Sequence, residues 1–80
     1  MSVVEILSPS QERRDLRRKI AAYIAFGVGS IWVISPATED IDIYEGGGRR
    51  TIRGDETLAS AYAPGFSITA SDLFERFRNG

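Results

Sequence analysis

SVVEILSPSQERRDLRRKIAAYIAFGVGSIWVIS, residues 2–35, is the stretch that decides the fold of this chain. It opens and closes with runs of β-branched and apolar residues, 2–7 and 30–35, which are typical of buried strands. Between them lies an apolar stripe at helical spacing, which consists of Leu16, Ile20, Tyr23 and Ile24. A strand, a helix and a strand in this order predict a right-handed βαβ unit with parallel strands. We expect both faces of each strand to be covered.

The helix between the two strands has recognisable ends. Ser8 is suited to the N-cap, Pro9 to the first helical position and Gln11 to the capping-box position. Ser10 is a competing cap. Gly27 follows the apolar stripe and is a natural terminator, because glycine adopts the left-handed conformation that ends many helices.

The second half of the chain predicts a hairpin and another helix. Residues 40–54, DIDIYEGGGRRTIRG, alternate apolar with acidic side chains, turn through three glycines and return. We expect an antiparallel hairpin with one solvated face. After a loop that contains APGF, Thr69 begins a short helix with Asp72 three residues beyond this cap. The predicted fold class is α/β: a βαβ unit, an antiparallel hairpin and a short C-terminal helix, in a single domain of residues 1–80.

Composition excludes several classes of function. The 80 residues contain no cysteine and no histidine, so the usual zinc sites and Ser-His-Asp catalysis are ruled out. Carboxylates are then the only strong metal ligands. No signal peptide and no membrane-spanning run is visible, and we therefore expect a cytoplasmic protein. The net charge of −1 argues against a protein that coats nucleic acid, but it allows local basic patches.

Glu5 is the anomaly of the first strand. Side chains alternate along a strand, so Glu5 shares a face with Val3 and Leu7, where an unpaired carboxylate would be costly. Lys19 stands at the edge of the apolar stripe, about 12–15 Å back from the turn along the helix, and Glu5 lies about 10 Å back along its strand. The spacing predicts that the two charges meet. A purely structural salt bridge fits this spacing as well as a catalytic pair does.

The ordered motifs of the chain resemble those of a known family. VVEILSPS, RRDLRRKIAAYIAFGV, IWVISP, a hairpin and APGFSI follow one another as in the carboxy-terminal part of the putative restriction endonuclease family. This family is a branch of the PD-(D/E)XK nuclease superfamily, and the resemblance extends over nearly all 80 residues.

The resemblance implies a restriction-endonuclease-like core that hydrolyses DNA with Mg²⁺ or Mn²⁺. It implies that Glu5 is a catalytic metal ligand and that the backbone carbonyl of Ile6 is another ligand. The superfamily's lysine would normally occupy the position of Leu7, but in this branch it looks displaced to the helix, where Lys19 stands. A carboxylate-held Mg²⁺ neutralises charge and generates hydroxide, and a lysine stabilises the charge of the transition state.

Asp15 and Tyr23 match further family positions, one turn on either side of Lys19, as supporting residues. One family feature is not found in these 80 residues: the strand with the motif's aspartate belongs upstream of the glutamate strand, and Met1 is only four residues before Glu5. We therefore expect a truncated domain whose aspartate comes from a complementing chain or from the second copy in a homodimer. The isolated chain should be weakly active or inactive.

Two arginine clusters are candidate contacts to DNA phosphates. The first cluster, on the predicted helix, consists of Arg13, Arg14, Arg17 and Arg18; the second, on the hairpin, consists of Arg49, Arg50 and Arg53. An ordinary solvated helix face is the alternative, supported by an Asp15–Lys19 pair at i, i+4. Tyr44 and Trp32 could stack on bases, although Trp32 lies within a run that predicts core.

Two further interpretations of the whole chain stay open at this point. One is a non-catalytic interaction or dimerisation module, in which the strand of residues 2–7 recruits a partner through its edge. The other is a decayed reading frame without a selected function.

Overall fold

The structure is a computed structural model that describes residues 2–7, 13–59 and 64–79. Its elements follow the chain in the order β1 (Ser2–Ile6), α1 (Arg13–Ala25), β2 (Ser30–Ser35), β3 (Asp40–Glu45), β4 (Gly48–Arg53), β5 (Thr57–Leu58), β6 (Ile68–Thr69) and α2 (Ala70–Asn79). The predicted α/β class and the order of strand, helix, strand, hairpin and helix are confirmed. The caps predicted for residues 8–11 lie outside the described residues.

The main sheet has the strand order β1-β2-β3-β4. β1 is parallel to β2, with Glu5 opposite Val33, and α1 forms the crossover that a parallel pair requires. β3 is antiparallel to both of its neighbours. The β3–β4 hairpin closes at Gly46 and Gly47, which both have positive φ angles (63° and 80°), as a two-residue turn of this kind requires.

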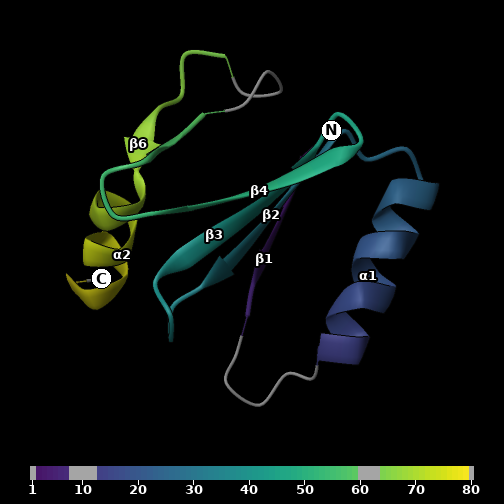
Figure 1. The fold of residues 1–80 in the computed structure, drawn as a ribbon, viewed down its shortest axis with the longest axis horizontal. Helices are drawn as coiled ribbons and strands as arrows, with labels where there is room; N and C mark the ends of the chain where they lie inside the picture. The colour runs from purple at the N-terminus through teal and green to yellow at the C-terminus, as the bar shows by residue number, and fades with distance from the viewer. Residues whose placement is uncertain (1, 8–12, 60–63, 80) are drawn as a thin grey trace.

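The two faces of the sheet carry separate hydrophobic cores, and α1 and α2 lie on opposite sides of it (Figure 1). On the α2 side, Phe74 and Leu58 pack over strands β2 to β4, in a cluster of Trp32, Ile34, Ile41, Ile43, Ile52, Leu58, Ala70 and Phe74. Thr69 caps α2, since its Oγ1 accepts a 3.1 Å hydrogen bond from the Asp72 N–H, as predicted.

On the α1 side, Ile20 packs against Ile31 and Val33 of β2. The helix ends as the sequence predicts, because Gly27 has a φ angle of 82° and Val28 N–H donates to the Tyr23 carbonyl at 3.0 Å. Gly27 N–H also donates to the Ile24 carbonyl at 3.0 Å. The two bonds form a Schellman motif, which satisfies carbonyls that the helix end would otherwise leave unpaired. The side chain of Tyr23 packs against the cluster of Ile20, Ile31 and Val33, over β2.

Three details differ from the sequence-based expectations. β1 is not covered on both faces: within the described residues it pairs only with β2, and Val4 and Ile6 are 51% and 55% exposed. The reason is that α2 packs over β2 to β4 and does not reach β1. Ile24, expected in the core-facing stripe, is also exposed. Finally, β5 and β6 pair as a second, two-stranded sheet where only a loop was predicted.

None of the helices in the described part of the chain combines the length and the apolar character of a membrane span.

Candidate active site

Glu5 faces α1 because of its place in the β1–β2 register. It lies opposite Val33, whose side chain belongs to the α1-facing core, and side chains of paired residues share a face. The side chain of Glu5 is only 18% exposed. The strand pattern therefore places a carboxylate at the border between the core and the open edge of β1, where it needs partners.

Both partners of this carboxylate come from α1. The Tyr23 hydroxyl donates a hydrogen bond to Oε1 of Glu5, and Lys19 Nζ lies 3.8 Å from Oε2. Lys19 and Tyr23 are four residues apart, so the helix presents both side chains on one face. The predicted meeting of Glu5 and Lys19 is thus found, and Tyr23, a supporting residue by family resemblance, makes a hydrogen bond to Glu5 that the sequence analysis did not predict. The i, i+4 spacing from Lys19 was the signal that could have revealed it.

Electrostatics distinguishes the two partners. The hydrogen bond to Glu5 raises the pKa of Tyr23, and desolvation and the negative charge of Glu5 add to this shift. Tyr23 therefore keeps its proton and stays a donor to the carboxylate at neutral pH. Lys19 is half exposed, and an ion pair of that kind typically contributes only about 0.2–1 kcal/mol.

The carbonyl of Ile6 points to the open edge of β1. The Leu7 N–H donates to the Ile34 carbonyl of β2 at 2.8 Å. In a trans peptide the carbonyl and the N–H of the same unit point in opposite directions, so the Ile6 carbonyl points away from β2. The residue next to Glu5 in the sequence thus offers an oxygen on the side where no strand of the described residues pairs.

A carboxylate oxygen and a carbonyl oxygen are the hard ligands that Mg²⁺ and Mn²⁺ prefer. They do not make a complete site, and no group of three or more acidic, histidine or cysteine side chains with metal-binding geometry exists among the described residues. Asp15 does not supply the missing ligand in this arrangement. It is exposed in the first turn of α1, and among the described residues Lys19 pairs with Glu5 and not with Asp15, its possible i, i+4 partner.

The arginine clusters occupy other surfaces. Arg14, Arg17 and Arg18 are exposed and line a shallow depression on α1 together with Ala21, whereas the side chain of Arg13 lies outside the described part. On the hairpin, Arg50 donates to the Ala59 carbonyl at 2.8 Å and Arg53 lies 3.7 Å from Asp40. The helix cluster is therefore the one that is open to an anionic ligand, because all three hairpin arginines, Arg49 through Tyr44, have partners among the described residues.

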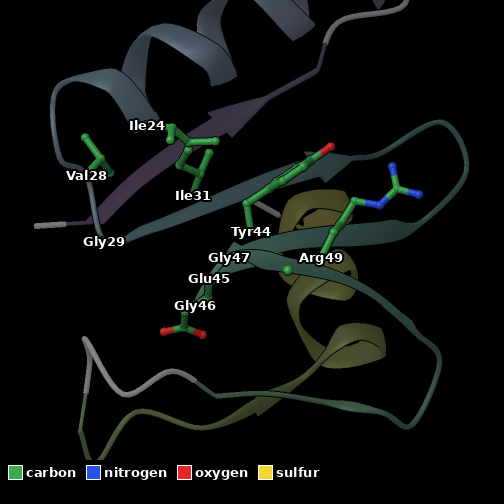
Figure 2. Close-up of a pocket in the computed structure, with 10 residues that line it drawn as sticks. Ile24, Val28, Gly29, Ile31, Tyr44, Glu45, Gly46, Gly47 and Arg49 are labelled. Atoms are coloured by element: carbon green, nitrogen blue, oxygen red, sulfur yellow. The ribbon is translucent and has the colours of Figure 1, made fainter.

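A cleft of about 500 Å³ lies between the end of α1 and the β3–β4 turn (Figure 2), and Glu5 is not one of its lining residues. Ile24, Val28 and Ile31 line its apolar side, and Tyr44 and Arg49 extend from the hairpin. A hydrogen bond from Arg49 to the Tyr44 hydroxyl raises the pKa of the guanidinium. Trp32 is not part of any such surface, because it is buried and donates to Ser30 Oγ at 2.8 Å.

Comparison with protein families decides the relationship of this chain. Residues 2–71 match the Uma2 family, described as putative restriction endonuclease. The chain belongs to this family. The match includes β1, α1 and β2, and therefore the elements that carry Glu5, Lys19 and Tyr23. A search of curated proteins found no match.

A solved structure supports the fold of this family member. It is the crystal structure of a putative nuclease belonging to DUF820 from Anabaena variabilis ATCC 29413, which superposes with a TM-score of 0.82 at 22% sequence identity. The match covers 92% of this chain and 43% of that chain. The two proteins share the fold, and this chain spans less than half the length of the nuclease to which it is similar.

Proposed function

We propose that this chain forms the lysine-bearing part of a Mg²⁺- or Mn²⁺-dependent DNA endonuclease site, with Glu5 and Lys19 as its catalytic residues. The observation that supports this most directly is the pairing of Lys19 with Glu5 on the edge strand β1, where the carbonyl of the next residue, Ile6, points outward. Membership of the Uma2 family points to nuclease chemistry in general. Because DNA is the proposed substrate, the cytoplasm is the proposed compartment.

The donor set fits a divalent ion in part. Glu5 and the Ile6 carbonyl would hold the ion, and when bound it would supply charge neutralisation at the phosphate and an activated water. A second carboxylate is still required. We propose that it comes from a strand that pairs with the open edge of β1, in a complementing chain or in a second copy of this one.

The residues of this chain would divide the remaining work. Lys19 is half exposed on the same side as Glu5, so its ammonium can contact a phosphate oxygen and stabilise negative charge as it develops. Arg14, Arg17 and Arg18, and Arg13 as their neighbour in sequence, would bind phosphates outside the reacting position and make DNA affinity dependent on salt.

Plasmid nicking with Mg²⁺ or Mn²⁺ tests the proposal. We expect weak cleavage by the 80-residue chain, because one protein carboxylate alone makes a poor site, and loss of that cleavage in Glu5→Gln and Lys19→Ala. Arg76→Gln, on the exposed part of α2, is the charge control. Cleavage that survives in folded Glu5→Gln would refute the assigned role of Glu5.

A non-catalytic interaction module is the second candidate. The half-exposed Val4 and Ile6 favour it, since they lie beside Trp32 and Ile34 on the edge strand β1, beyond the strands that α2 covers. On this proposal, association through β1 would be specific, metal would have no effect on it, and Glu5→Gln would change stability but no activity.

A further inference from the structure

The two oxygens of Glu5 have partners of different character. Oε1 accepts the hydrogen bond from Tyr23, while Oε2 faces the ammonium of Lys19 at 3.8 Å. That second distance is longer than a charge-assisted hydrogen bond, which spans about 2.7–2.9 Å. Glu5 is therefore bonded through one oxygen and only loosely paired through the other.

The two partners also differ in how firmly they are held. The ring of Tyr23 packs against the cluster of Ile20, Ile31 and Val33, beside the Schellman motif that ends α1. Lys19 has a long flexible stem, and half of its side chain is exposed. The rigid partner is the tyrosine, and the mobile partner is the lysine.

We propose that Tyr23 is the positioning residue of Glu5, because its hydroxyl fixes Oε1 and so leaves Oε2 for a divalent cation. This rests on the proposed function and assigns the tyrosine a part in it. A carboxylate held by Tyr23 cannot turn fully toward Lys19, and the lysine is consequently free to leave Glu5 and contact a substrate phosphate.

Removal of the Tyr23 hydroxyl changes which group the Glu5 carboxylate contacts. Without Tyr23 as a donor, Lys19 is the remaining charged partner of Glu5 within the described residues. The carboxylate then turns toward the ammonium, and a cation has to compete with Lys19 for both oxygens. Tyr23→Phe tests this directly, since it keeps the ring and removes only the hydrogen bond.

The first measurement is Mn²⁺ binding to the 80-residue chain, followed by electron paramagnetic resonance of the free ion. Loss of a group that orients a metal ligand typically weakens metal binding about 10- to 100-fold, and we expect this range for Tyr23→Phe. Tyr44→Phe is the matched control, because the Tyr44 hydroxyl contacts Arg49 and not Glu5. Equal Mn²⁺ affinity in Tyr23→Phe and the parent would overturn the proposal.

The second measurement needs no metal. Lys19 is the only lysine of the sequence, so an amine-reactive reagent and peptide mass spectrometry report its accessibility at one fixed pH. We expect slower modification of Lys19 in Tyr23→Phe, where Glu5 pairs with it more closely, and no change in Tyr44→Phe. If the parent binds no Mn²⁺, this chain alone does not form the metal site of the proposed function, and the lysine measurement decides on Tyr23: slower modification supports the positioning role, and an unchanged rate overturns it.

Discussion

Val4→Thr combined with Ile6→Thr tests whether the open edge of β1 is an interface. Both side chains lie on the α2 side of the sheet, in line with Trp32 and Ile34, and both are about half exposed. Threonine keeps the β-branched shape that favours a strand, while it makes the exposed surface more polar. The substitution therefore changes the edge of the sheet and leaves the cores over β2 to β4 in place.

The magnitude follows from the exposed fractions. Complete burial of a valine or isoleucine side chain contributes about 1.5–3 kcal/mol, so a partner that covers the exposed half of each gains about 1 kcal/mol per residue. The double substitution should then weaken association by about 2 kcal/mol, which corresponds to a dissociation constant raised about 30-fold. A homodimer of the parent chain at micromolar concentration is the expected starting point.

Sedimentation equilibrium measures this constant, and the fluorescence of Trp32, the only tryptophan, follows docking next to Val4. Phe77→Thr is the control, since Phe77 is similarly exposed but lies on α2. A parent chain that is strictly monomeric at micromolar concentration, or a double variant that associates as tightly as the parent, would refute the reasoning about this edge.

Three shorter predictions concern charge, core and cap. Glu5→Gln should lower the pKa of Tyr23 toward its ordinary value, measured by NMR titration of the tyrosine ring, because the carboxylate is the main cause of the raised pKa. In the parent, this bond stabilises the fold below the unfolded-state pKa of about 10, and the stabilisation is lost as the pH rises through the higher folded-state pKa. Ile43→Ala should destabilise the fold by about 2–5 kcal/mol in urea unfolding, since the side chain is fully buried; an effect below about 1 kcal/mol would contradict its central place in the core. Thr69→Ala should cost about 1 kcal/mol through loss of the bond to the Asp72 N–H, while Thr69→Ser should retain most of it, and the same urea unfolding measures both.

The sequence predicts β1 to β4 and both helices because each has a local signal, whereas the two-residue strands β5 and β6 were missed. The apolar run of residues 30–35, the glycines at the hairpin turn and Gly27 act through backbone conformation and strand propensity, which are properties of short segments. The exposure of Val4 and Ile6 has no such signal, since it depends on how far α2 extends across the sheet. An apolar run predicts that a strand tends to be buried, and tertiary packing decides whether a helix or another strand buries it.

The candidate site also has one contact that the sequence predicts and one that it does not. The approach of Lys19 to Glu5 was predictable, because helix rise and strand rise fix both positions relative to the turn between them. The hydrogen bond from Tyr23 was missed, since a tyrosine in an apolar stripe predicts a core position, and the packing of its ring is indeed core. Its hydroxyl reaches Glu5 only because α1 lies across β2 at this particular distance from β1. For a side chain with an apolar body and a polar tip, the sequence pattern predicts where the body packs but not what the polar tip contacts.

The positions of Glu5 and the Ile6 carbonyl relate the proposed strand pairing at β1 to the proposed metal-dependent cleavage. Within the described residues, the side-chain partners of Glu5 come from α1, on one face of the sheet, and the carbonyl of the next residue, Ile6, points away from β2, toward the open edge. On the endonuclease proposal, a further metal ligand would approach from that edge, where an added strand would also cover Val4 and Ile6. The endonuclease and the interaction module thus share their first step, and they differ in whether the added strand brings a carboxylate next to Glu5. A partner strand in which each acidic residue is replaced by its amide should still bind β1. On the endonuclease proposal, it should not raise the Mn²⁺ affinity of the complex as the unmodified strand does.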